Sequence, residues 1–221
     1  MLTTCDFQNS KADLGEGVYW DSEYDSLFWV DINQSILFSC SNGHIFEYQI
    51  SENISAVLSV EGGIVCLSNR SGLINYHLAS NSISQISRTP SMYSTKEYRA
   101  NDGVKLGDRL YIYGVMRNEP VKNDGALIVS KDGVSKVICT DISIPNTFIK
   151  IPNSQSLLIP DSFDGMVYKL TFNEAWSSIV SKIKWFDLSR TNTTPDGGCI
   201  SSDGRVFIAI WDGFKILELD L

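Results

Sequence analysis

The sequence predicts an all-β fold built from repeated sheets, and three kinds of observation support this prediction. Short runs alternate apolar and polar residues, as in segment 44–50, which is the period-2 pattern of a half-buried strand. Dipeptides such as Asn42-Gly43 and Asp132-Gly133 separate these runs and suit tight hairpin turns. In addition, an apolar strand that follows a turn recurs along the whole chain of 221 residues.

This recurring strand predicts the architecture. Its anchors are spaced 46, 37, 47 and 49 residues apart. They are Leu27, Leu73, Leu110, Leu157 and Val206. A period of ~45 residues with about four short strands is typical of one blade of a β-propeller, whereas a sandwich would not explain a repeated anchor at this spacing. We therefore predict a single β-propeller domain over residues 1–221, with about four and a half blades in this chain.

The remaining strands follow from the same alternation. They are expected at 63–68, 72–78, 110–115, 126–130, 135–139, 166–172, 183–188 and 215–219. Only 173–182 has a composition that suits a brief helix. The chain stops in the apolar strand 215–219, and such an end leaves unpaired sheet edges. We expect either a shortened version of a longer chain or an unusual closure of the ring.

Composition excludes some functions and indicates a compartment. The net charge of −8 argues against a nucleic-acid partner, which needs a basic surface. No apolar run reaches the ~20 residues that cross a bilayer, and segment 1–6 lacks the features of a signal peptide. The five cysteines are scattered without a Cys-x-x-Cys pair, which suits reduced core thiols in a cytoplasmic protein. They are Cys5, Cys40, Cys66, Cys139 and Cys199.

Four polar residues occupy nearly the same point of the repeat. Counting back 10 or 11 residues from four of the anchors gives Glu16, Arg99, Asn146 and Asp196. In a radial array of similar sheets, equivalent positions lie on one ring, so we expect these side chains to face one another. The chain has two histidines, His44 and His77, and neither has a partner at metal or triad spacing. Zinc chemistry based on histidine and a Ser-His-Asp triad are therefore excluded.

The residue types of the ring suit a hard divalent cation. Two carboxylates and an amide, without imidazole or thiolate, favour Ca²⁺, Mg²⁺ or Mn²⁺. Carboxylates gathered in a channel repel each other and lose hydration, so one would protonate unless a cation neutralises the pair. Three protein oxygens leave positions open for water and substrate, as in a catalytic metal site. Singly, each residue could be an ordinary turn or cap residue; their shared position favours a site.

Six short motifs, in order and with compatible spacing, resemble those of one family. The motifs are Leu14-Gly15-Glu16-Gly17, Arg99-Ala100-Asn101-Asp102-Gly103, Gly114-Val115-Met116, Pro145-Asn146-Thr147, Pro160-Asp161-Ser162 and Pro195-Asp196-Gly197-Gly198. They resemble the regucalcin-like family of senescence marker proteins, gluconolactonases and luciferin-regenerating enzymes. The resemblance runs from about residue 14 to the end of the chain. Two positions differ from the family pattern: Val18 replaces a proline, and Thr147 replaces a glycine.

The resemblance implies a fold, an activity and residue roles. It implies a six-bladed propeller, of which the C-terminal blade region is absent here, and a metal-dependent lactonase acting on sugar-type lactones. Glu16, Asn146 and Asp196 would hold one divalent ion, with Ca²⁺ favoured and Zn²⁺, Mn²⁺ or Mg²⁺ as alternatives. Asp196 would also act as general base. Arg99, Asn101 and Glu119 would contact the substrate.

Two other residues and two other functions belong to this interpretation. Asp102 and Asp161 are interpreted as hydrogen-bonding supports for the ring rather than as ligands. The first alternative function is a non-catalytic metal-binding propeller that serves as a regulator or interaction scaffold. The second is another hydrolysis on the same fold, with phosphotriesters or other esters as substrates.

Overall fold

The computed structural model describes residues 11–191 and 193–221, which form five antiparallel sheets of consecutive strands. The first sheet contains β1 (Gly15–Asp21), β2 (Ser26–Asp31), β3 (Ile36–Ser41) and β4 (His44–Gln49). The second contains β5 (Ile54–Glu61), β6 (Ile64–Asn69), β7 (Gly72–His77) and β8 (Ser82–Arg88). The third contains β9 (Tyr98–Gly107), β10 (Leu110–Arg117), β11 (Ala126–Lys131) and β12 (Val134–Cys139).

The last two sheets complete the chain. The fourth contains β13 (Ile149–Lys150), β14 (Ser156–Asp161), β15 (Met166–Phe172) and β16 (Ile179–Asp187). The fifth has three strands, β17 (Thr194–Ile200), β18 (Arg205–Trp211) and β19 (Lys215–Asp220). A short 3₁₀ helix, η1 (Ser91–Tyr93), lies between the second and third sheets. No helix in the described parts of the chain is long and apolar enough to cross a membrane.

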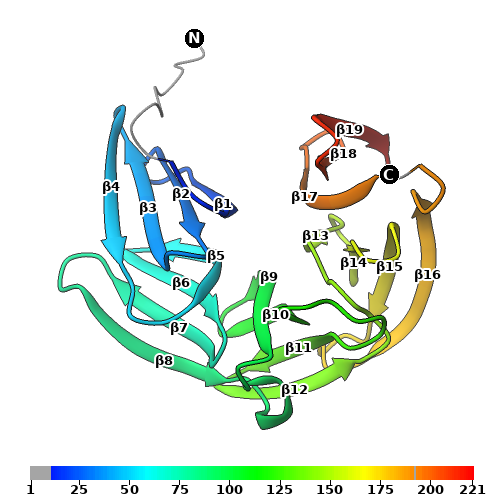
Figure 1. Cartoon of the computed structure of the whole chain (residues 1–221), viewed down its shortest axis with the longest axis horizontal. Coiled ribbons are helices and arrows are strands. Elements are labelled where there is room, and N and C mark those ends of the chain that lie inside the picture. The colour runs from blue at the N-terminus through cyan, green and yellow to red at the C-terminus, as the bar shows by residue number, and fades with distance from the viewer. Residues whose placement is uncertain (1–10, 192) are drawn as a thin grey trace.

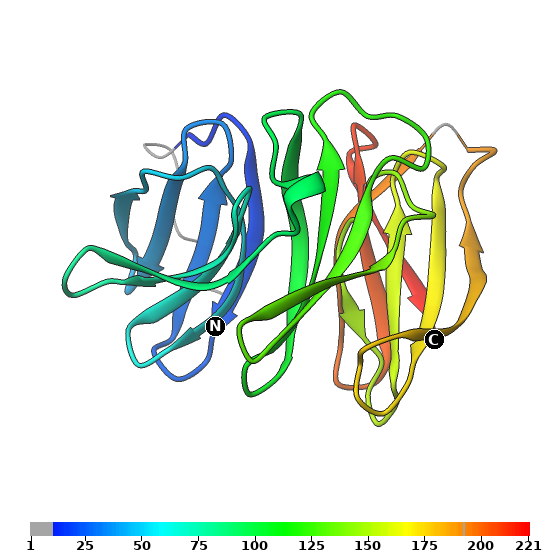
Figure 2. The same ribbon diagram turned by 90° about the horizontal axis from the view of Figure 1, so that it is seen from below.

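The sheets are arranged as the blades of a propeller. They follow one another around a common axis, with β1, β5, β9, β13 and β17 innermost and β4, β8, β12 and β16 on the outer rim (Figure 1). The arc is open between the first and the fifth sheets (Figure 1). Seen from the side, most strands run along the axis of the arc (Figure 2). The predicted all-β propeller is therefore confirmed, with four blades of four strands and a fifth of three.

The core consists of apolar layers between successive sheets. Each layer contains fully buried side chains from two neighbouring sheets: Leu37 with Leu67, Leu73 with Tyr113, Leu127 with Leu157, and Leu158 with Ile208. Burying one such side chain stabilises the fold by about 1.5–3 kcal/mol. Every sheet in the middle of the arc is packed on both faces by these layers. The first and fifth sheets each share one such layer, and the other face of the first sheet has a small buried cluster of its own, Trp29, Phe38 and Cys40.

Tight turns follow the predicted chemistry. At Asn42-Gly43 both residues have positive φ, 49° and 78°, and the same holds at Asp132-Gly133, with 49° and 83°. Two consecutive residues of positive φ define the hairpin turn that matches the twist of the strands, and Asn, Asp and Gly tolerate this geometry. Both dipeptides close their hairpins as predicted.

One repeat anchor was assigned to the wrong strand. Leu27, Leu110, Leu157 and Val206 lie in the second strands of their sheets, whereas Leu73 lies in β7, the third strand of its sheet. The register places Val65 of β6 at the position of Leu27, 38 residues further along the chain. Strands β6 and β7 are both almost fully buried, so their apolar patterns do not distinguish them.

The helix predicted at 173–182 is wrong. Residues 173–178 form a turn, in which Asn173 Oδ1 accepts the N–H of Ser177 at 2.8 Å, and β16 begins at Ile179. Trp176 has a φ of 57° and packs against Phe172, with ring centroids 5.1 Å apart. The asparagine side chain thus supplies the hydrogen bonds that a helical turn would have made.

The cysteines agree with the prediction only in part. Cys40 and Cys66 are buried in the core, Cys139 is half-buried and Cys199 is exposed. Cys5 and the segment 1–6 lie outside the described residues.

Candidate active site

The inner strands share an irregularity at one level of the propeller. The register between the inner and second strands shifts after Glu16 in β1, between Ala100 and Gly103 in β9, and between Pro195 and Gly198 in β17. In the fourth sheet, Pro145 pairs with Asp161 and Ile149 with Leu158, which also leaves one extra residue on the inner side. Such bulges bend a strand locally and turn a side chain out of the regular alternation.

This irregularity defines the equivalent positions. Near the end of each second strand, one residue pairs with a residue of the inner segment of the same sheet. In four sheets, the residue that directly follows this inner partner carries a carboxyl or amide group. These are Glu16, Asn101, Asn146 and Asp196. Arg99 lies two residues before Asn101, so the count from the anchors was wrong for the third sheet. That count started at Leu110, whereas the register places Tyr111 at the position of Leu27. In the second sheet the equivalent residue is Ser55, which directly follows Ile54, the partner of Asn69, and is buried next to Ala56.

Direct hydrogen bonds join the fourth and fifth sheets at this level. Asn146 donates through Nδ2 to Asp196 Oδ1, and also to Ser162 Oγ at 3.3 Å. Its own Oδ1 accepts the backbone N–H of Thr147 at 3.0 Å. Asn146 is 8% exposed, so the amide is held by partners on both of its polar atoms in a buried setting.

The third sheet joins the same group through Arg99 and Asn101. Arg99 Nη1 donates to Asn101 Oδ1 at 2.5 Å and to Ala100 O at 3.1 Å. Asn101 Nδ2 in turn donates to Pro145 O at 3.0 Å, across the boundary between the third and fourth sheets. These bonds fix the guanidinium of Arg99 at the centre of the propeller.

The electrostatics show that Glu16 shares this centre. Its pKa is raised from 4.5 to about 8, first because the side chain is buried, and then because the carboxylates of Asp196 and Asp102 lie close by; Arg99 lowers it. Burial likewise raises the pKa of Asp102 to about 6. The backbone N–H of Gly103, which donates to Oδ1 at 2.7 Å, lowers this pKa but does not cancel the rise. The first sheet thus brings its glutamate to the carboxylates of the third and fifth sheets.

Asp196 and Arg99 influence each other within this group. Burial raises the pKa of Asp196, while the hydrogen bond from Asn146 and the charge of Arg99 lower it. Burial lowers the pKa of Arg99, and the charges of Glu16 and Asp196 raise it. The central cluster, as we name this group, has three carboxyl groups and one guanidinium. Its members are Glu16, Arg99, Asn101, Asp102, Asn146 and Asp196.

The donor set of the central cluster fits a hard cation, although it is no ready-made metal cage. Within residues 11–191 and 193–221, no three His, Cys, Asp or Glu side chains are grouped so that they could hold a metal ion. The predicted ligands are two carboxylates and an amide, and Asn146 presents its nitrogen to Asp196. Burial raises the pKa of Glu16 and of Asp196, and neighbouring carboxylates add to the rise at Glu16; a divalent ion bound here would favour the charged form of both groups.

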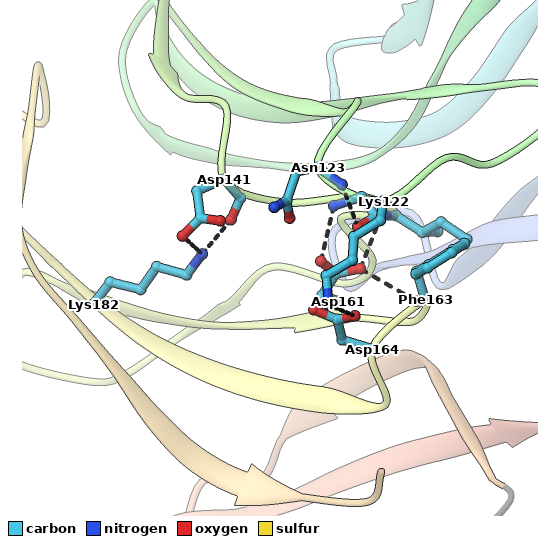
Figure 3. A network of polar contacts seen from close by, with 9 residues as sticks. Lys122, Asn123, Asp141, Asp161, Phe163, Asp164 and Lys182 are labelled. Carbon is cyan, nitrogen blue, oxygen red and sulfur yellow. Dashed lines mark hydrogen bonds and ion pairs between the residues drawn. The ribbon is translucent and has the colours of Figure 1, made fainter.

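Asp161 supports the loop that contains Asn146, as predicted. Its carboxylate accepts the backbone N–H groups of Ser143 at 2.8 Å, Ile144 at 3.0 Å and Phe163 at 3.2 Å. Figure 3 shows Asp161 at the centre of this network, with the ion pair of Lys122 and Asp164 beside it. The carboxylate therefore fixes the course of the chain just before Asn146.

Among the predicted site residues, Glu119 takes no part in these hydrogen bonds. It is exposed in the loop after β10, and no hydrogen bond or ion pair of the described chain joins it to the central cluster. Thr147 and Ser162 were not among the predicted site residues, although both contact the central cluster. Both residues end motifs quoted above, but a single hydroxyl residue in a loop does not by itself indicate a site.

Comparisons with known proteins show the family of the chain. Residues 14–221 match the SMP-30/Gluconolactonase/LRE-like region. The chain belongs to the SMP-30/gluconolactonase/LRE-like family. Two curated relatives illustrate the range of this family: regucalcin of Gallus gallus is 23% identical, over 94% of this chain and 71% of its own length. A pentonolactonase of Haloferax volcanii is 20% identical, over 99% of this chain and 74% of its own length.

Solved structures of the family share the fold. A calcium-binding regucalcin from Agrobacterium tumefaciens superimposes with a TM-score of 0.86 at 18% identity, over 94% of this chain and 70% of that protein. At this identity the similarity shows the propeller fold alone. The chain thus spans about 70% of the six-bladed family propeller that it matches.

Proposed function

We propose that this protein is a metal-dependent hydrolase that opens sugar-type lactones. The observation that carries the proposal is the meeting of Glu16, Asn146 and Asp196 from three sheets beside the guanidinium of Arg99. Burying carboxylates around the guanidinium of Arg99 costs free energy, because the charged groups lose hydration, so packing alone does not explain this arrangement. The lactonases among the family relatives support the same substrate class.

The proposed metal ligands are Glu16, Asn146 and Asp196, with Ca²⁺ as the favoured ion and Zn²⁺, Mn²⁺ or Mg²⁺ as alternatives. For this role the amide of Asn146 must turn so that Oδ1, rather than Nδ2, faces the carboxylates. A bound divalent ion would polarise the ester carbonyl and stabilise the negative charge that develops on its oxygen, an effect typically of several kcal/mol. A calcium-binding regucalcin of the same fold supports the choice of ion.

The residues of the chain supply the proton transfer and the orientation of the substrate. Asp196 Oδ1 accepts the bond from Asn146, while Oδ2 accepts no hydrogen bond within the described residues and is available to take a proton from the attacking water. Asp196 then returns that proton to the ring oxygen as it leaves. Arg99 uses Nη1 within the protein, so its Nη2 and Nε remain for the hydroxyl groups of a sugar lactone. Asn101 and Glu119 are proposed as further substrate contacts.

The first prediction tests this assignment. Asp196→Asn and Glu16→Gln are expected to lower kcat/KM for a sugar lactone by at least ~100-fold, because each removes a charge that the reaction needs. The assay follows acid release with a pH indicator, on protein stripped with chelator and reloaded with Ca²⁺, Zn²⁺, Mn²⁺ or Mg²⁺. Glu47→Gln on the outer strand β4 is the matched control and is expected to keep wild-type rates.

Three outcomes would contradict the proposal. Full activity in excess chelator would exclude a metal-dependent reaction. Bound metal without turnover of any lactone would favour the non-catalytic alternative, a metal-binding regulator or scaffold. Turnover of aromatic esters or phosphotriesters, but not of sugar lactones, would keep the site and change its substrate class.

A further inference from the structure

Two hydroxyl groups that flank strands of the fourth sheet donate hydrogen bonds to the bulge that contains Asp196. The bulge lies between Pro195 and Gly198, where the register with β18 shifts. Ser162 Oγ donates to Pro195 O at 2.6 Å, and Thr147 Oγ1 donates to Gly198 O at 2.9 Å. The backbone is therefore held on both sides of Asp196 by the neighbouring sheet.

The same two residues hold the side chain of Asn146. Ser162 Oγ accepts from Asn146 Nδ2 at 3.3 Å, and the backbone N–H of Thr147 donates to Asn146 Oδ1 at 3.0 Å. Asn146, Thr147 and Ser162 are all buried, at 8%, 4% and 7% exposure. One buried network of neutral groups thus joins an amide and a carboxylate that come from different sheets.

The position of the fifth sheet makes this network important. This sheet ends the arc, and its packing cluster joins it to the fourth sheet. β17 is only partly buried, unlike β5, which is buried along nearly its whole length. With packing from one neighbour, the position of Asp196 depends more strongly on directed hydrogen bonds than it would between two sheets.

Thr147 donates this hydrogen bond from an unfavourable backbone conformation. Its φ is 21°, a region that L-residues avoid and β-branched residues avoid most. Such conformations cost of the order of 1–3 kcal/mol and persist where the surroundings impose them. A Cβ at Gly198 would lie 2.5 Å from Phe207 O in β18 and 3.4 Å from Thr147 Cγ2, so glycine lets the bulge lie close to both residues.

We propose that Thr147 and Ser162 are positioning residues that set the distance between Asp196 and Asn146, and so the geometry of the metal site. This inference rests on the proposed function for its metal readout. The loop before β13 and the turn after β14 thereby align the fifth sheet with the fourth. Neither residue touches the substrate in this account.

The test compares hydroxyl removal at this boundary with hydroxyl removal at another. Thr147→Val and Ser162→Ala remove the bonds to the bulge, and Thr147→Ser keeps a hydroxyl group as the rescuing variant. Ser130→Ala is the matched control, because Ser130 Oγ donates to Ser87 Oγ at 2.7 Å, a buried bond between the third and second sheets. Ca²⁺ affinity is measured by titration calorimetry on chelator-treated protein, well below the unfolding temperature of each variant.

Thr147→Val and Ser162→Ala are expected to weaken Ca²⁺ binding about 10-fold or more, as for other residues that orient metal ligands. Thr147→Ser and Ser130→Ala are expected to stay within about 3-fold of the wild type, although Ser130→Ala lowers the unfolding temperature. If Thr147→Val and Ser162→Ala lower the unfolding temperature but leave Ca²⁺ affinity unchanged, their role is structural and the inference is overturned.

A second measurement separates this inference from the proposed function. In metal-free protein with ¹³C-labelled aspartate carboxyl groups, the Asp196 signal is assigned by its loss in Asp196→Asn. It is expected to shift in Thr147→Val and Ser162→Ala and to stay in place in Ser130→Ala. Should wild-type protein bind no divalent ion while these shifts occur, the metal proposal fails and the positioning role stands. An unmoved Asp196 signal in both variants overturns the positioning role.

Discussion

The sheets at the two ends of the arc differ from those in its middle, and the difference concerns both packing and charge. The second, third and fourth sheets are packed on both faces, and β5 is buried along nearly its whole length. The first and fifth sheets have partly exposed inner strands, β1 and β17. Yet these two end strands contribute Glu16 and Asp196, the two carboxylates proposed to hold the metal.

This comparison shows where the molecule is least stable. Glu16 and Asp196 repel each other across the part of the arc where the first and fifth sheets are not joined by a packing cluster. Stability is rarely uniform across a fold, and segments with fewer buried contacts open first. We therefore expect the middle of the arc to be the stable part, and the two ends to respond to ions and to pH.

The largest expected effect is on stability, and it contrasts a middle sheet with an end sheet. Leu157→Ala, in the fully buried layer between the third and fourth sheets, is expected to lower the free energy of unfolding by about 3 kcal/mol. Leu217→Ala, in the partly buried β19, is expected to lower it by about 1 kcal/mol, because less apolar surface loses its contacts. Urea denaturation measures both. Equal losses would show that the end sheets are packed as firmly as the middle.

A divalent ion is expected to act mainly on the ends of the arc. At a Ca²⁺ concentration 100 times Kd, binding to the folded state alone adds about 2.7 kcal/mol to the free energy of unfolding. Because the proposed ligands come from β1, β17 and the loop before β13, the added protection against hydrogen exchange should concentrate there. β6 and β7 serve as internal reference strands. At exchange times too short for global unfolding, uniform protection, or protection of β6 and β7 alone, would place the ion elsewhere.

The sequence predicted the repeat and the central residues better than it predicted their register. Glu16, Asn146 and Asp196 were found because their spacing from apolar anchors is nearly constant in their sheets. Asn101 was found only through the family resemblance, since the count from Leu110 pointed to Arg99. The count failed because it started at Leu110, whereas the register makes Tyr111 the equivalent of Leu27, and two adjacent apolar residues do not show which of them is the anchor.

Contacts between sheets were the other part that the sequence could not supply. The hydrogen bonds from Thr147 and Ser162 to the bulge depend on how the fourth and fifth sheets pack against each other. This packing involves residues far apart in the sequence. Similarly, Leu73 was wrongly predicted as an anchor in a second strand, because β6 and β7 are both largely buried and both apolar. Periodicity reports which face is buried, but it does not report which neighbour buries it.

The smallest effect concerns the pH dependence of the metal-free protein, and it tests the cost of ionising the buried Glu16 at one end of the arc. Glu16 has a pKa of about 8 in the folded protein against an ordinary 4.5, so the folded state holds this proton more tightly than the unfolded state does. The resulting stability is fully present below pH 4.5 and is lost as the pH rises towards 8. After allowance for the partial exposure of Glu16, we expect a loss of about 2 kcal/mol between pH 5 and pH 8 in chelator. Glu16→Gln should flatten this part of the profile, and Glu47→Gln should not. A metal-free protein whose stability rises over this range would show that Glu16 is ionised at little cost in the folded state.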